Sequence, residues 1–128
     1  MPDRSPALMY TIDDEQGVVF VELLELSDPR AVIRCITDLR RDPRFHVTYD
    51  IVVDCSHLAR VPDRRLIERY ARLSRKTVVG ERRGRIAICA SSGRTYGMAR
   101  FFEMLSGVSS EYLCAFRTEQ QAAAWLCA

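Results

Sequence analysis

Hydrophobic and polar positions alternate along the chain in blocks that predict strands and helices in turn. Residues 8–12 and 17–24 are short apolar runs, separated by a polar stretch with a glycine that is typical of a hairpin turn. Segments between and after the later strands repeat their apolar residues at helical spacing. Three further apolar runs have the composition of buried strands and cover residues 50–54, 85–90 and 112–116.

Helix boundaries are marked by residues with known capping roles. Asp28 followed by Pro29 predicts a helix start, because aspartate accepts hydrogen bonds from free N–H groups and proline fits the first helical position. Asp63, which follows a proline, marks a second start. Gly107 is placed to end a third helix, and Thr118 opens a capping-box pattern for the last.

These elements give the order β-β-α-β-α-β-α-β-α. Strands that alternate with helices predict parallel pairing through right-handed crossovers, and the opening hairpin adds one antiparallel edge strand. The expected fold class is therefore α/β, with a mixed, mostly parallel five-stranded sheet and four main helices. The length of 128 residues suits one domain, 1–128, in which residues 1–7 form a loose N-terminal arm.

Composition excludes several classes of protein. The net charge of +2 indicates no general affinity for nucleic acid or membranes, so such a role would need a local patch. The five cysteines form no C-x-x-C pair and are odd in number, which favours a reduced, cytoplasmic setting over a disulfide framework. No signal core or membrane-spanning run is present, and the histidines and cysteines lack zinc spacing. We expect no metal and no cofactor.

Several segments between residues 8 and 127 carry a family resemblance. They are Tyr10, Ile12 and Gly17 in the hairpin, and residues 50–54, 85–88, 96–103, 116–122 and 125–126. Together with the order of elements, they resemble the STAS (SpoIIAA-like) fold, and in particular the small bacterial SpoIIAA-like or STAS/SEC14-domain proteins. The resemblance implies a binding or regulatory role, since such relatives bind partner proteins, nucleotides or apolar ligands.

The chain departs from this family at one functional position. Anti-sigma factor antagonists carry a phosphorylatable serine at the start of the helix that follows the central strand. Residues 58–65 here contain no hydroxyl side chain. Phosphorylation switching by that route is therefore not expected. Asp63 either imitates a permanent negative charge or is an ordinary N-cap.

The central strand ends in residues of chemical interest. Asp54 stands where a receiver domain places its phosphoacceptor, but Asp13 and Asp14 lie in a hairpin turn and no lysine follows the last strand. The neighbouring Cys55 and His57 would need mutual contact and an orienting group for nucleophilic catalysis. A loop with structural side chains is the alternative, and we predict no catalytic residues.

The loop before the third helix is the candidate ligand or anion site. It joins a buried strand to a helix N-terminus, where free N–H groups and the helix dipole favour an anion. It lacks the phosphate-loop and dinucleotide patterns, so a plain tight turn is the other interpretation. The candidate residues are Ser91, Ser92, Arg94, Tyr96 and Arg100.

Two surfaces are candidates for partners. Phe101, Phe102 and Met104 exceed one narrow helical stripe, which favours a partner or homodimer contact, although core packing explains at least some of them. A basic stripe on the second helix is a solvated face by default, or else a site for nucleic acid, an acidic protein or a membrane. The stripe consists of Arg65, Arg69, Arg72 and Lys76.

The leading hypothesis is a non-enzymatic binding or regulatory module that acts through protein–protein contacts, as a homodimer or with another protein. The alternative is a carrier or sensor of a small apolar or anionic ligand, with a pocket near Tyr96, Arg100 and Phe101. An enzyme comes third and would require a cleft that unites Asp54, Cys55 and His57.

Overall fold

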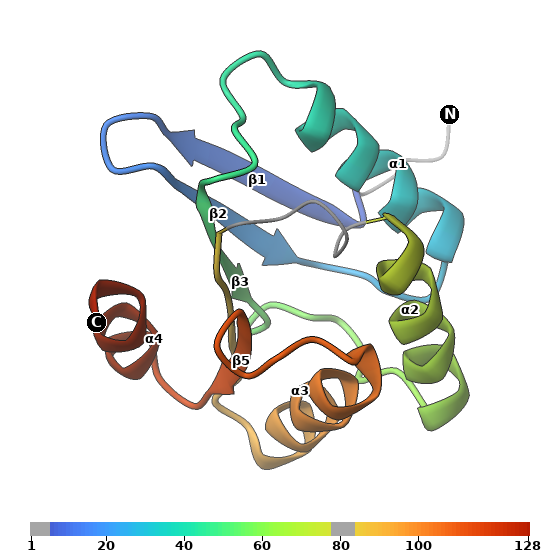
Figure 1. The fold of residues 1–128 in the computed structure, drawn as a ribbon. Helices are drawn as coiled ribbons and strands as arrows, with labels where there is room; N and C mark the ends of the chain where they lie inside the picture. The colour runs from blue at the N-terminus through green and yellow to red at the C-terminus, as the bar shows by residue number, and fades with distance from the viewer. Residues whose placement is uncertain (1–5, 78–83) are drawn as a thin grey trace.

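The computed structural model describes residues 6–77 and 84–128, and its elements follow the predicted order (Figure 1). The strands form one sheet in the order β1-β2-β3-β4-β5, in which β1 and β2 are antiparallel and all other neighbours are parallel. The predicted α/β class, mixed sheet and antiparallel edge strand are confirmed. The elements are β1 (Leu8–Asp13), β2 (Val18–Leu23), α1 (Pro29–Arg41), β3 (Asp50–Asp54), α2 (Arg64–Thr77), β4 (Ile86–Cys89), α3 (Gly93–Ser106), β5 (Leu113–Phe116) and α4 (Glu119–Cys127).

The predicted capping residues lie at the starts and ends of their helices, as expected. The Asp28 carboxylate accepts a hydrogen bond from the Arg30 N–H at 3.0 Å, and Asp63 accepts one from the Leu66 N–H at 2.9 Å. Gly107 ends α3 in the left-handed conformation, at a φ of 74°. Helix α3 begins at Gly93, because Ser92 is its N-cap.

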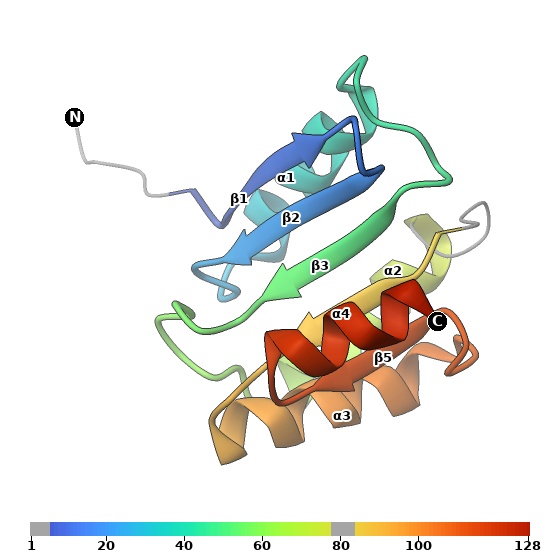
Figure 2. The same ribbon diagram turned by 90° about the vertical axis from the view of Figure 1, so that its left-hand side faces the viewer.

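The helices are distributed unequally over the two faces of the sheet. Helices α1, α2 and α3 cover one face, and α4 lies alone on the other (Figure 2). The strand order never reverses, so each right-handed crossover from β2 to β5 passes over the same side. Helix α4 follows the last strand and has no crossover to make, which leaves it free to occupy the second face.

The second face is covered over only part of its width. Helix α4 packs Ala122 onto Ala87 and Cys89 and therefore shields β4 and β5. Within the described residues, no helix covers β1 and β2 on this side, and the two strands expose 54% of Met9 and 46% of Phe20. We predicted that residues 50–54 would be buried on both faces, and this was wrong. In β3 only Ile51 is fully buried: Val52 packs at the margin of the α4 cluster, and Val53 lines the cavity on the other face.

The core on the three-helix face is divided between two clusters. One joins β1, β2 and α1 around Val19 and Val32, and the other joins β4, β5 and α3 around Ala99 and Leu113. Helix α2 packs mainly on α3 instead of on the strands beneath it. Helix α2 therefore lies over the central strands, but its side chains do not fill the space between helix and strands.

The N-terminal arm is shorter than predicted. Residues 1–5 lie outside the described part of the chain. Ala7 is buried, and its carbonyl accepts hydrogen bonds from the N–H groups of Leu24 and Glu25 at 2.9 and 3.0 Å. The chain is therefore fixed from Ala7 onward, because these bonds extend the pairing of β1 with the end of β2.

Val19 tests the core that this packing produces. It is fully buried between β1 and β3, so we expect Val19→Ala to lower the free energy of unfolding by about 2 kcal/mol. Denaturant titration measures the change. The control is Met104→Ala on the exposed side of α3, where a change within about 0.5 kcal/mol is expected. Equal losses in both variants would contradict the assigned burial.

Candidate apolar ligand-binding site

The carboxyl edge of the sheet, where the sequence places most candidate residues, has no topological crevice. In open α/β sheets the ligand cleft forms where the strand order reverses and neighbouring connections leave toward opposite faces. The strand order here runs from β1 to β5 without a reversal. The loops that follow β3 and β4 therefore lead to helices on the same face, and they do not enclose a cleft between them.

Asp54 ends β3, and Cys55 and His57, which follow it, point to different sides. Cys55 is buried in the cluster beneath α3, and burial raises the pKa of its thiol to about 12. His57 Nδ1 instead lies 2.7 Å from Oε1 of Glu22, which is on the half-covered face. Asp54 accepts a hydrogen bond from the Ser56 N–H at 2.9 Å and shapes the turn.

No catalytic arrangement follows from these positions. Ser56 Oγ lies 3.3 Å from the same His57 nitrogen that faces Glu22, whereas a nucleophile and its orienting carboxylate need opposite ring nitrogens. The receiver-domain interpretation fails as well. Asp13 pairs with Val18 at the start of β2, so it lies at the opposite edge of the sheet from Asp54.

The predicted anion site before α3 is occupied by the protein's own contacts. Ser92 Oγ donates to Thr95 Oγ1 at 2.7 Å and accepts from the Thr95 N–H at 3.2 Å, so it acts as the helix cap. Ser91 and Arg94 are exposed on the same turn. Ser92 thus has a structural role as the cap of α3, and anion binding at Ser91 and Arg94 stays a prediction.

The remaining two residues of that candidate site are also engaged. Arg100 donates to both carboxylate oxygens of Glu103, at 2.9 and 3.2 Å, and Glu103 also accepts from the Ala115 N–H. The Arg117 guanidinium lies 4.4 Å from the centre of the Tyr96 ring. Arg100 therefore has a carboxylate partner already, and the Tyr96 ring is covered on one side.

The three residues proposed for partner contact point in three directions. Phe102 packs into the core beneath α3. Phe101 is half-buried, with the Arg64 guanidinium 5.0 Å from its ring centre. Met104 is 76% exposed. Of the three, Met104 alone is an open contact residue, as the helical repeat of 3.6 residues requires when Ala99 and Phe102 face inward.

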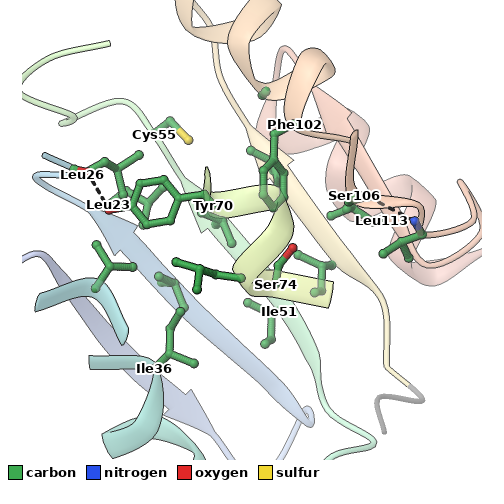
Figure 3. Close-up of a pocket in the computed structure, with 18 of the residues that line it drawn as sticks. Leu23, Leu26, Ile36, Ile51, Cys55, Tyr70, Ser74, Phe102, Ser106 and Leu113 are labelled. Carbon is green, nitrogen blue, oxygen red and sulfur yellow. Dashed lines mark hydrogen bonds between the residues drawn. The ribbon is translucent and has the colours of Figure 1, made fainter. Parts of the chain in front are cut away.

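A cavity of about 590 Å³ lies on the three-helix face, between the sheet and helices α1, α2 and α3 (Figure 3). It is open to the outside. It lies beneath α2, between the two core clusters. Its walls are almost entirely hydrocarbon. The labelled lining residues are Leu23, Leu26, Ile36, Ile51, Cys55, Tyr70, Ser74, Phe102, Ser106 and Leu113.

Three hydroxyl groups in the cavity wall already have partners. The Tyr70 hydroxyl donates to the Leu26 carbonyl at 2.6 Å and ties α2 to the segment before α1, and burial raises the pKa of Tyr70 to about 12. Ser74 Oγ donates to the Ala71 carbonyl at 2.9 Å, and Ser106 Oγ donates to the Glu103 carbonyl at 2.7 Å. The cavity therefore offers an apolar surface and few free hydrogen-bonding groups.

Because the cavity is open to the outside, water can enter it. Its apolar wall is nevertheless a poor environment for water, since a well-held water molecule needs two to four polar partners. An apolar guest would gain about 25 cal/mol for each Å² of hydrocarbon surface removed from water.

The cavity lies elsewhere than the sequence predicted. Tyr96, Arg100 and Phe101 do not line it, whereas Met98, Ala99 and Phe102 of the same helix do. The apolar stripes of α1 and α2 were recognised, but as ordinary core. The sequence feature that could have indicated the cavity is the presence of small residues on the inward faces of the helices, such as Ser74 and Ala99. Such residues reveal a cavity only when the positions of the facing elements are known.

The basic stripe of α2 is on the outer surface, as the spacing predicts. Arg65, Arg69 and Arg72 are exposed on the side of α2 that faces away from the sheet. The side chain of Lys76 lies outside the described residues. No helix in residues 6–77 and 84–128 combines the length and apolar character needed to cross a bilayer. Within the same residues, no three histidine, cysteine or carboxylate side chains gather as a metal site requires.

A comparison with protein-family models and with curated proteins finds no match for this chain. The likeness to SpoIIAA-like proteins therefore stays a resemblance. What the chain binds has to be inferred from the geometry of its own surfaces and cavity.

Cysteine labelling tests the environment at the end of β3. Because the pKa of Cys55 is raised to about 12 and that of Cys89 to about 11, both stay protonated at pH 8, and a protonated thiol is a poor nucleophile. We expect iodoacetamide to alkylate the exposed Cys127 at least roughly 100-fold faster, as peptide mass spectrometry would show. Unfolded protein, in which all cysteines react, is the control. Comparable rates in the native protein would contradict the burial of Cys55.

Proposed function

We propose that this protein is a non-enzymatic binding module that holds an elongated, apolar small molecule in the cavity beneath α2. The observation that carries the proposal is the cavity itself: about 590 Å³, open to the outside and walled by hydrocarbon. This volume is within the range of ligand pockets, roughly 300–1,000 Å³. The scarcity of free polar groups in the wall favours a guest selected by shape and hydrophobicity.

The regulatory part of the proposal rests on the resemblance to STAS-type proteins and on the position of α2. This helix forms the roof of the cavity, packs mainly on α3 and is tied to the segment before α1 by the Tyr70–Leu26 hydrogen bond. A guest that contacts α1 and α2 together would fix their separation. The outer surface of the two helices would then differ between the filled and the empty protein, which is what a sensor needs.

A fluorescent probe tests the cavity directly. Nile red, a neutral dye that becomes bright in apolar surroundings, should bind with saturable fluorescence. Ser74→Phe places an aromatic ring in the cavity and should weaken binding at least tenfold, because ring and dye compete for one space. The control is Glu68→Phe on the outward side of α2, which should bind like the wild type. Absence of saturable binding to the wild type, or equal affinities in all three proteins, would refute the carrier function.

Protein–protein contact is the second candidate, and a different observation favours it. The half-covered sheet face exposes Met9 on β1, opposite Glu22, and Phe20 on β2, opposite Thr11, and within the described residues β1 has an unpaired edge. Exposed apolar groups on an open sheet edge are typical of pairing surfaces. A homodimer would place this face, instead of Phe101 and Phe102, at the interface.

Native mass spectrometry distinguishes this surface from α3. We expect the native mass to be twice the chain mass, and Phe20→Ser to return it to one chain, because the substitution removes the largest apolar group from the open face. Met104→Ser, on the exposed side of α3, is the control and should leave the dimer intact. A wild-type protein that stays monomeric at high concentration would rule out self-association.

A further inference from the structure

Two rows of arginine lie on the outward side of the three-helix layer. On α1 and α2 they follow helical spacing, and all six side chains are exposed: Arg30, Arg34, Arg41, Arg65, Arg69 and Arg72. None of the six forms an ion pair with another residue in the described part of the chain. Only Asp38 and Glu68 interrupt the rows with negative charge. The surface therefore carries a strong local positive field, although the net charge of the chain is only +2.

The same two helices form the walls of the cavity with their opposite sides. Ile33 and Ile36 of α1, and Tyr70 and Leu73 of α2, line the cavity and are each only partly buried. Figure 3 shows Ile36 and Tyr70 reaching into the cavity from these two helices. The cavity therefore lies directly behind the two helices that carry the arginine rows.

The far face of the molecule carries carboxylates as well as one arginine. Glu22 on β2 and Asp50 and Asp54 on β3 alternate with core-facing residues and so point to the half-covered side of the sheet. Arg85 lies on the same side, where its guanidinium packs on Trp125 of α4 and donates to the Trp125 carbonyl. The exposed arginines of α1 and α2 and these three carboxylates therefore lie on opposite sides of the sheet. An anionic surface would attract one side and repel the other, which fixes the orientation in which the protein approaches it.

We infer that the outward face of α1 and α2 docks on a negatively charged lipid bilayer. The inference rests on the proposed function, because a membrane is both the anionic surface that suits the arginines and a source of an elongated apolar guest. Guanidinium groups bind lipid phosphates through paired N–H donors. Nucleic acid suits the surface less well, since no aromatic side chains stand between the arginines to stack on bases.

Vesicle co-sedimentation tests the docking surface. The intact protein should bind phosphatidylcholine vesicles that contain roughly one-third phosphatidylglycerol. It should not bind vesicles of pure phosphatidylcholine, and about 0.5 M NaCl should abolish its binding to the anionic vesicles. Because each basic residue near an anionic surface strengthens binding about fivefold, Arg34→Gln/Arg69→Gln/Arg72→Gln should weaken it roughly 100-fold. Circular dichroism confirms that each variant is folded.

A second triple variant controls for net charge. Gln120→Glu/Ala123→Glu/Ala124→Glu changes the charge of the chain by the same amount on the exposed side of α4, on the opposite face of the sheet. It should bind vesicles nearly as well as the wild type. Equal losses in both variants would show that net charge alone governs binding and would overturn the inference. Wild-type protein that ignores anionic vesicles, or that prefers duplex DNA to them at equal salt, would overturn it too.

Nile red titration of the same wild-type sample keeps this result separate from the proposed function. Saturable dye binding without vesicle binding would leave the carrier standing and remove the docking surface. Vesicle binding that depends on the α1 and α2 arginines, without dye uptake, would support the docking surface and remove the carrier.

Discussion

Right-handed crossovers on a sheet whose strand order never reverses place every connecting helix on the same face. Three helices must share that face because three crossovers connect β2, β3, β4 and β5. The second face receives only α4, which shields β4 and β5. The crowded face, the open face and the lack of a cleft at the carboxyl edge are all consequences of this one topological constraint.

The cavity arises from how the three helices divide the crowded face. Helix α1 packs at the β1 side and α3 at the β5 side, while α2 takes most of its contacts from α3. A space remains between α2 and the middle strands of the sheet. A hydrogen bond from Tyr70 to Leu26 connects α2 to the segment that leads into α1. Helix α2 is thus held mainly by its packing on α3, together with this hydrogen bond to the segment before α1.

Charge and hydrophobicity follow the same division of the molecule. The layer that encloses the cavity carries arginines outside, and the open side of the sheet carries carboxylates around Met9 and Phe20. A ligand function and a partner function would therefore use opposite faces and need not compete. By contrast, the residues at the carboxyl ends of β3 and β4 act in local structure, since Asp54 shapes a turn and Ser92 caps α3.

The residue pattern was sufficient for the elements and their pairing, because strand and helix periods, caps and turn glycines act over a few residues. Asp28, Gly107 and Thr118 bound their helices as predicted, although Gln121 of the capping box reaches the Arg117 N–H instead of its own cap. The pattern also located the arginines of α2 on the outer surface.

Local residue patterns are therefore sufficient to predict the α/β class, the strand pairing and the direction of the helical faces. The tertiary structure decided that Cys55 and His57 leave the sheet on opposite sides and that α4 covers only part of the second face. It also decided that the inward stripes of α1 and α2 enclose a cavity in place of a filled core. The reason is physical: periodicity fixes which way a side chain points, whereas the space in front of it depends on elements that are distant in sequence.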